Sequence, residues 1–99
     1  MADRNEILEF FRKYKSELLN KYELRFVALF GSYARQEQNE QSDIDLLIEF
    51  NDNVKDLHKK KRELKKEISN RFNVDVDICR DKYIKDYFRD LIYRDAIYF

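Results

Sequence analysis

The sequence predicts a single α/β domain in which helices cover one face of a small β-sheet. Two periodicities carry this prediction: apolar residues recur at helical spacing in long stretches, and shorter stretches are either continuously apolar or strictly alternating, as strands are. The stretches follow one another as helix, strand, short helix, strand, helix, strand and helix. No repeat, low-complexity tract or linker divides the 99 residues, so residues 1–99 are expected to form one domain.

The first half of the chain begins with a helix and a buried strand. Residues 3–22 have apolar side chains at helical spacing, and Asp3 is a candidate N-cap for that helix. Residues 25–30 read RFVALF, a continuous apolar run that is typical of a central strand buried on both faces. The only glycine of the chain, Gly31, follows this run and precedes a polar stretch with room for one short helix.

Two alternating strands are expected in the middle of the chain, at residues 43–50 and 74–79. Each has one apolar face and one face that begins with carboxylates. These faces carry four aspartates, namely Asp43, Asp45, Asp75 and Asp77. Acidic residues are depleted in strands, so four of them at alternating positions favour a function over chance.

Two further helices are expected at residues 53–71 and 83–99, the second ending in AIYF, a short segment compatible with extended backbone. The basic run HKKKRELKK at residues 58–66 fits the solvated side of an amphipathic helix, or a surface for an acidic partner. Aromatic residues are dense in the tail and are expected mainly to pack in or around the core, although they would also suit a partner interface. These are Tyr83, Tyr87, Phe88, Tyr93, Tyr98 and Phe99.

Composition excludes several classes of protein. The 20 basic and 20 acidic residues cancel, which argues against a general nucleic-acid binder. The chain has no apolar run of membrane-spanning length, and its N-terminus is too charged for a signal peptide, so a cytoplasmic protein without membrane contact is expected. One cysteine, Cys79, and one histidine, His58, exclude an internal disulfide and disfavour a soft-metal site.

The strand at residues 43–50 is a candidate magnesium site. Asp43 and Asp45 are two residues apart on a strand, so they share a face with Cα atoms about 6.5–7 Å apart. Their oxygens can converge on one cation or on a pair, and carboxylates with phosphate oxygens suit Mg²⁺. Asp77, or alternatively Asp75, could add a third carboxylate from the neighbouring strand. The alternative is that these aspartates only solubilise strand ends.

Gly31 and Ser32 are a candidate phosphate site. They lie between a buried strand and a short helix, where backbone N–H groups are free to meet an anion. Glycine permits a close backbone approach, and the serine hydroxyl adds a donor. By itself the pair is also compatible with a mere strand-to-helix turn. Together with a following Asp-x-Asp, it provides the phosphate cradle and metal pair that nucleotidyl transfer from a triphosphate needs.

The segment GSYARQEQNEQSDIDLLIEF resembles the signature of the DNA polymerase β-like nucleotidyltransferase superfamily, in which Gly-Ser is followed after a spacer by Asp-x-Asp. Here the spacer is ten residues, Tyr33 to Ser42. The chain is also similar to the minimal nucleotidyltransferases, the MNT group, and to the MntA-type antitoxins of HEPN–MNT toxin–antitoxin systems. The segments that carry this similarity are LFGSYAR…SDIDLLIEF, the later VDVDI and the closing IYRDAIYF. The resemblance runs from about Arg25 to the C-terminus.

The resemblance implies a polymerase β-like fold with a small mixed sheet and a role for each motif residue. Gly31 and Ser32 would hold the triphosphate of ATP. Asp43, Asp45 and Asp77 would be the catalytic carboxylates and the ligands of two Mg²⁺ ions. Arg35 could reach the phosphates, or simply be exposed on the short helix. The implied reaction is transfer of AMP to a tyrosine of a HEPN ribonuclease toxin, which silences the toxin.

The sequence departs from the family at Gln36, where these proteins usually have glycine after Ala-Arg. If the backbone there is left-handed, a residue other than glycine costs about 1–2 kcal/mol. Two alternative functions stay open: an antitoxin that neutralises its partner by binding alone, and a small-molecule nucleotidyltransferase. A chain this short has no separate acceptor domain, so a partner or a homo- or hetero-oligomer would have to bring the acceptor.

Overall fold

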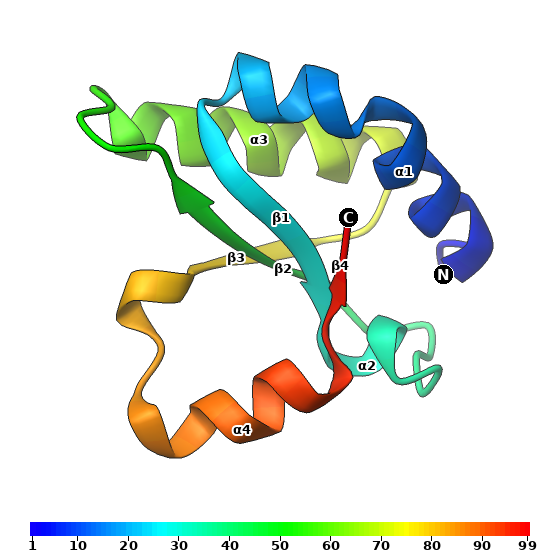
Figure 1. Cartoon of the computed structure of the whole chain (residues 1–99). Helices are drawn as coiled ribbons and strands as arrows, with labels where there is room; N and C mark the ends of the chain where they lie inside the picture. The colour runs from blue at the N-terminus through cyan, green and yellow to red at the C-terminus, as the bar shows by residue number, and fades with distance from the viewer.

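The computed structural model describes the whole chain, Met1–Phe99, and contains the predicted elements in the predicted order (Figure 1). The helices are α1 (Arg4–Lys21), α2 (Gly31–Ala34), α3 (Leu57–Phe72) and α4 (Asp86–Asp95), with a single 3-10 turn, η1 (Asp81–Tyr83), before α4. The strands are β1 (Leu24–Phe30), β2 (Ile44–Phe50), β3 (Val76–Arg80) and β4 (Ile97–Tyr98). None of the helices combines the length and apolar character that crossing a membrane requires.

The four strands form one mixed sheet in the order β3-β2-β1-β4. β1 is antiparallel to both β2 and β4, whereas β2 and β3 are parallel. The predicted α/β class with a small mixed sheet is therefore confirmed, with β1 in a central position as its apolar run suggested. The register places Phe30 opposite Asp45, and Asp45 opposite Asp77.

Helices α1 and α3 lie on the same side of the sheet and cover it, as predicted (Figure 1). Asp3 is the N-cap of α1, because its carboxylate accepts hydrogen bonds from the backbone N–H groups of Asn5 and Glu6. A cap of this kind stabilises a helix by about 1 kcal/mol. The core forms between the inner faces of these helices and the sheet, and its fully buried residues include Ile7, Phe11, Val27, Leu29, Ile44, Leu46, Ile48, Leu64 and Ile68.

Helix α3 begins later than the predicted residue 53. Asn53 and Asp56 have φ angles of 62° and 58°, a left-handed conformation that a right-handed helix cannot include. The basic run lies on α3 as expected, since this helix buries only Leu64 and Ile68 and leaves most of its lysines in solvent.

Helix α4 lies on the side of the sheet opposite α1 and α3, a placement that the sequence did not predict (Figure 1). None of its residues is buried. The expectation that the tail aromatics pack in or around the core is wrong for Tyr83, Tyr87 and Phe88, which are 67%, 72% and 46% exposed, and Tyr98 is also 51% exposed. Phe99 does pack against the core, where its ring stacks on Phe11 with centroids 5.0 Å apart. The helical pattern identified an apolar face but not how little would cover it.

Candidate active site

The turn after β1 brings the chain's only glycine against Asp45. Gly31 has φ +75°, the left-handed region that favours glycine. A Cβ added to Gly31 would lie 2.1 Å from Oδ2 of Asp45 and 3.0 Å from its Cγ. This contact follows from the antiparallel register, which pairs Phe30 with Asp45. The glycine is therefore required both for its backbone conformation and for the space that the Asp45 carboxylate occupies.

Helix α2 is one turn long and ends at a left-handed residue. Gln36 has φ 61°, its N–H donates to the carbonyl of Tyr33 (3.4 Å), and the N–H of Glu37 donates to the carbonyl of Ser32 (2.9 Å). These bonds form a Schellman motif, which glycine normally terminates. The left-handed backbone considered from the sequence is thus present, with glutamine adopting it.

The N-terminus of α1 holds the glycine turn in place. Arg4 Nε donates to the carbonyl of Tyr33 at 2.6 Å, and Arg4 Nη2 donates to that of Ala34 at 3.3 Å. The fully buried Tyr33 accepts a hydrogen bond from the backbone N–H of Ala2 through its hydroxyl (3.2 Å). Sequence reasoning missed Arg4 and Tyr33, because contacts spanning about 30 residues leave no local pattern.

Three aspartates gather where β2 and β3 begin. Asp45 and Asp77 are direct partners in the parallel ladder, and Asp43 immediately precedes β2. Asp75 lies before β3, is exposed, and uses its backbone carbonyl to accept from the N–H of Ile44 (2.9 Å). Of the two third-carboxylate candidates, Asp77 is the one that the register sets beside Asp45.

The electrostatics of these aspartates show uncompensated negative charge. Burial, followed by the charges of Asp77 and Asp43, raises the pKa of Asp45 to about 6, and Arg35 offsets part of that rise. The pKa of Asp43 is also raised, by burial and by the charges of Asp77 and Asp75. Arg35 is exposed and donates from Nε to Glu37 at 3.0 Å. A cluster of like charges this weakly neutralised favours a bound cation.

The protein does not by itself arrange three or more acidic, histidine or cysteine side chains to hold a metal ion. Mg²⁺ commonly takes only one or two carboxylates from a protein and completes its coordination with water and substrate phosphates. The carboxylates of Asp43 and Asp45 fit that pattern, so the donor chemistry suits Mg²⁺ brought together with a nucleotide.

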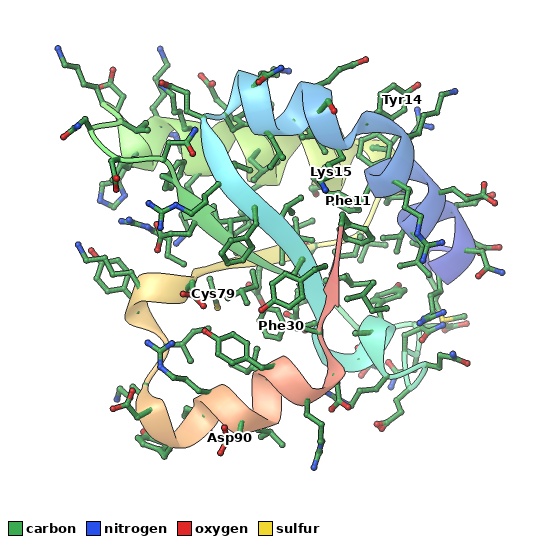
Figure 2. The ribbon with its side chains drawn as sticks, in the orientation of Figure 1. Phe11, Tyr14, Lys15, Phe30, Cys79 and Asp90 are labelled. Atoms are coloured by element: carbon green, nitrogen blue, oxygen red, sulfur yellow. The ribbon has the colours of Figure 1, made fainter.

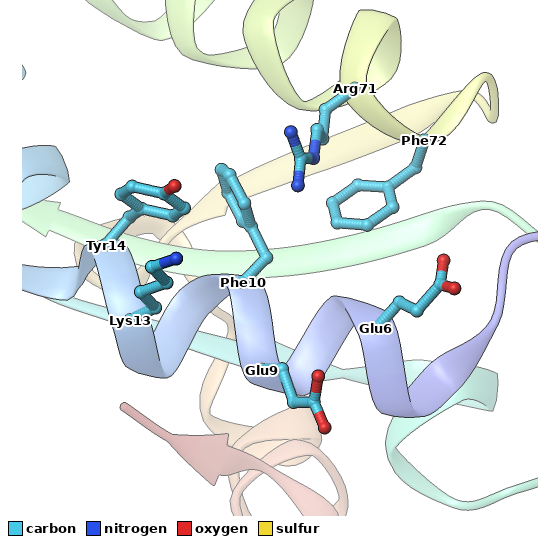
Figure 3. Close-up of a pocket in the computed structure, with 7 residues that line it drawn as sticks. All are labelled: Glu6, Glu9, Phe10, Lys13, Tyr14, Arg71 and Phe72. Atoms are coloured by element: carbon cyan, nitrogen blue, oxygen red, sulfur yellow. The ribbon is translucent and has the colours of Figure 1, made fainter.

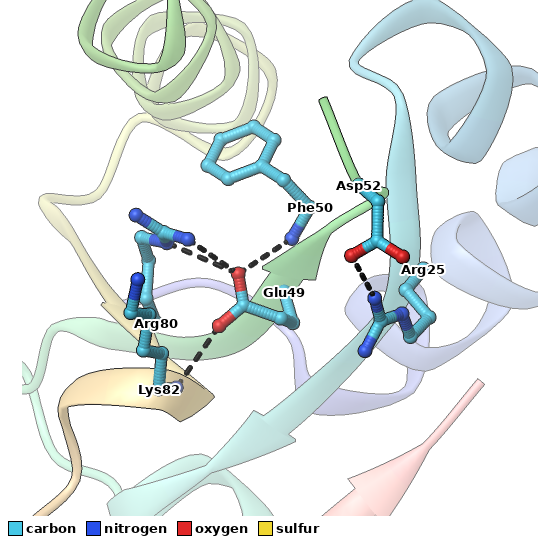
Figure 4. A network of polar contacts seen from close by, with 6 residues as sticks. All are labelled: Arg25, Glu49, Phe50, Asp52, Arg80 and Lys82. Carbon is cyan, nitrogen blue, oxygen red and sulfur yellow. Dashed lines mark hydrogen bonds and ion pairs between the residues drawn. The ribbon is translucent and has the colours of Figure 1, made fainter. Parts of the chain in front are cut away.

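A buried carboxylate, Glu49, ties β3 to β2 beyond the aspartates (Figure 4). Arg80 donates to Glu49 Oε2 from Nη2 (2.7 Å) and Nε (3.1 Å), and the N–H of Lys82 donates to Oε1 (2.9 Å). Burial alone would raise the pKa of Glu49, but these bonds and the one from the Phe50 N–H hold it below its ordinary range. In the alternation of residues 43–50, Glu49 falls on the same face as Asp43 and Asp45, but that pattern does not predict this pairing.

A separate groove lies away from these residues. It has a volume of about 550 Å³ and runs between α1 and the end of α3, among Phe10, Tyr14, Arg71 and Phe72 (Figure 3). None of its lining residues belongs to the glycine turn or the aspartate cluster. Arg71 covers the Phe10 ring at 5.2 Å, so packing accounts for these residues.

The comparisons with known proteins agree with this arrangement. A family model described as "Nucleotidyltransferase domain" matches residues 8–99. "Putative protein adenylyltransferase MJ0126" of Methanocaldococcus jannaschii is 40% identical over 99 residues, 99% of each chain. "Protein adenylyltransferase MntA" of Thermococcus cleftensis is 29% identical over 98 residues, 99% of this chain and 97% of that protein.

Solved structures show the same fold. One described as "Structure of putative minimal nucleotidyltransferase" superposes with a TM-score of 0.75 at 30% identity, covering 93% of this chain and 92% of the other. The MNT antitoxin in complex with the tri-AMPylated HEPN toxin of Shewanella oneidensis has a TM-score of 0.61 at 18% identity, covering 91% and 69%. The aspartate cluster and glycine turn thus stand on the fold of minimal nucleotidyltransferases, and this enzyme belongs to the nucleotidyltransferase domain family.

Proposed function

We propose that this enzyme transfers AMP from ATP to a protein hydroxyl, a tyrosine of a HEPN ribonuclease toxin, and thereby acts as the antitoxin. The observation that carries the proposal is the placement of Asp45 between the Gly31 turn on one side and Asp77 on the other. A nucleotide bound at that turn would have its phosphates beside two carboxylates, as phosphoryl and nucleotidyl transfer require.

Each site residue has a role in the proposed reaction. The backbone N–H groups after Gly31 have no side-chain cap from Phe30, which leaves them available to phosphate oxygens. The Ser32 hydroxyl and Arg35 would add donors to the phosphates. The oxygen of the acceptor hydroxyl forms a bond to the α-phosphorus. Asp77 accepts the proton that this hydroxyl loses. The bond from that phosphorus to the pyrophosphate oxygen breaks, and pyrophosphate leaves.

Asp43 and Asp45 are the residues that would hold Mg²⁺. When bound, the metal supplies charge neutralisation for the phosphates and the acceptor oxygen. The pKa of Asp45 is raised to about 6, as is expected of a carboxylate whose negative charge a cation would stabilise. With Asp43 and Asp45 as ligands, the Mg²⁺ site needs no further protein ligand once a nucleotide is present.

Two features support a protein acceptor. Relatives that align with this chain over nearly their whole length are described as protein adenylyltransferases. The structurally similar MNT antitoxin is in complex with an AMPylated HEPN toxin. The exposed aromatics Tyr83, Tyr87 and Phe88 provide a surface on which a protein could dock.

The test is an incubation with Mg²⁺ and ATP labelled at the α-phosphate, together with the product of the neighbouring gene. We expect label on that protein, on tyrosine by mass spectrometry, and its loss with Asp43→Asn or Asp45→Asn. Asp75→Asn is the matched control and should retain transfer. ATP labelled at the γ-phosphate should label nothing. If both variants still neutralise the toxin, the binding-only antitoxin is favoured. If the label appears on a small molecule, the small-molecule nucleotidyltransferase is favoured.

A further inference from the structure

A second groove, here called the β3–α4 groove, lies between the outer strand β3 and helix α4 and has a volume of about 410 Å³. Ile78, Cys79, Phe88 and Ile92 form its apolar walls, and Lys61 and Lys85 are among its basic residues. Figure 2 shows Cys79 on the side of β3 that faces α4. No carboxylate lines the groove, although 20 of the 99 residues are acidic.

The groove lies two residues along β3 from the aspartate cluster. Cys79 follows Asp77 by two residues, so the two side chains lie on the same face of β3. Burial, and then the charge of Asp45, raises the pKa of the Cys79 thiol, to which Asp77 also contributes. Because the strand order is β3-β2-β1, the site has a defined sequence across the sheet: the Gly31 turn, Asp45, Asp77, and then the groove.

The charges of the groove favour an acidic occupant. Neither Lys61 nor Lys85 is within 4.0 Å of a carboxylate. Arg80 also lines the groove, but its charge is matched by Glu49. Two unpaired lysines above an apolar floor would attract a segment that carries both carboxylates and apolar side chains.

The shape favours an extended polypeptide. β3 is paired only with β2 and leaves its outer edge free, which is the arrangement that accepts an added strand. Phe88 is 46% exposed beside that edge and offers a ring against which an apolar side chain can pack.

We infer that the β3–α4 groove binds the acceptor polypeptide as an extended, acidic segment, anchored by an apolar side chain, so that its hydroxyl reaches Asp77. The inference rests on the proposed transfer to a protein, and it adds where the acceptor binds and which segment chemistry is selected. ATP is assigned to the other side of the aspartates, so both substrates can be bound together.

The test uses a fluorescein-labelled peptide in which glutamates flank an isoleucine–tyrosine–isoleucine core, with a counterpart that has lysines in place of the glutamates. Binding is followed by fluorescence anisotropy at low salt. We expect the acidic peptide to bind about tenfold more tightly than the basic one, and Lys85→Glu and Phe88→Ala each to weaken it about tenfold. Both residues are exposed, so both variants should fold, as their thermal unfolding will show.

The matched controls are exposed residues that do not line the groove. Lys66→Glu changes the same charge on the exposed side of α3, and Leu91→Ala shortens an apolar side chain of α4 that is 55% exposed. Both should leave peptide binding within about twofold. No binding of the acidic peptide, equal effects of groove and control variants, or displacement of the peptide by Mg²⁺-ATP would each overturn the inference.

The two proposals can fail separately. If the peptide binds as expected but no AMP reaches any protein, the proposed function falls, and only the selection of an acidic, extended segment by the groove stands. If AMP is transferred to the toxin while Lys85→Glu and Phe88→Ala leave the KM for the toxin unchanged, only the groove inference falls. In the expected case, both variants raise the KM for the toxin about tenfold and leave the KM for ATP unchanged.

Discussion

The carboxylate of Asp45 occupies space that only a glycine at residue 31 leaves free, since a Cβ on Gly31 would lie 2.1 Å from Oδ2 of Asp45. The turn at Gly31, where we propose that the phosphates bind, therefore also positions the Asp45 carboxylate, which we propose binds Mg²⁺. Any side chain at residue 31 must displace one or the other. The sequence associated this glycine with a bound triphosphate, and the structure adds a contact within the protein itself.

Gly31→Ala is expected to abolish AMP transfer and to destabilise the fold by about 1–2 kcal/mol for the left-handed backbone alone, with the collision adding to this. The collision can be separated by a double-mutant cycle with Asp45→Ala, which removes the atoms that Cβ would meet. In urea unfolding, Gly31→Ala should cost less in the Asp45→Ala background than in the wild type. Equal costs in both backgrounds would show that the contact carries no energy.

Gln36→Gly should stabilise the protein. Gln36 has φ 61°, and relief of the left-handed conformation is worth about 1–2 kcal/mol, reduced by the greater freedom of glycine in the unfolded chain to a net of about 0.5–1 kcal/mol. For a domain of this size the melting temperature should rise by about 2–8 °C. Glu37→Gly is the control, since residue 37 lies one position beyond the left-handed residue and should not stabilise. A lower melting temperature for Gln36→Gly would mean that the glutamine side chain makes a compensating contact.

The sequence predicted well what depends on local pattern. The alternation of residues 43–50 and the N-cap at Asp3 use short-range periodicity and capping chemistry, and both lie where the pattern indicated. What it could not predict depends on register and on distant packing. The contact of Gly31 with Asp45 needs the antiparallel pairing of β1 with β2, and the Arg4 anchor needs α1 to begin beside that turn. The side of the sheet on which α4 lies is likewise decided by a crossover and not by its own periodicity.

Stability without divalent cations should depend on pH through Asp45. Its folded-state pKa of about 6 is above the unfolded value near 3.9, so the folded state binds the proton more tightly. The favourable contribution is complete below about pH 4 and is lost as pH rises through 6. The Asp45→Asn variant has no carboxylate to ionise at this position, so it does not lose stability in this way. The stability of the variant relative to the wild type should therefore increase between pH 4 and 7. Unfolding by urea at several pH values measures the difference.

Magnesium provides the second arm of that experiment. If Asp45 binds Mg²⁺, adding Mg²⁺ with a non-hydrolysable ATP analogue should stabilise the wild type at pH 7.5 and leave Asp45→Asn unaffected. Asp90→Asn on exposed α4 is the control and should behave like the wild type throughout. A stability difference between Asp45→Asn and the wild type that stays constant from pH 4 to 7 would contradict the buried, repelled carboxylate.

The Glu49–Arg80 pair should be far more important to stability than the neighbouring Arg25–Asp52 pair, although both have short contacts, 2.7 and 3.0 Å (Figure 4). The side chains of Glu49 and Arg80 are 11% and 14% exposed, whereas those of Asp52 and Arg25 are 88% and 55% exposed. Arg80→Met leaves the Glu49 carboxylate nearly buried with only its backbone partners, and we expect a loss of about 3 kcal/mol. Asp52→Ala should cost about 0.5 kcal/mol or less.

The double variant Glu49→Leu/Arg80→Met tests the reason for that difference. If the cost of Arg80→Met comes from an uncompensated buried charge, removing the charge should restore much of the lost stability. If it comes from lost packing of Arg80 over the rings of Phe50 and Tyr83, which lie 5.3 and 5.1 Å away, the double variant should be no more stable than the single one. Because the pair ties β3 to β2 next to Asp77 and Asp45, AMP transfer measured on the same variants should follow the recovered stability.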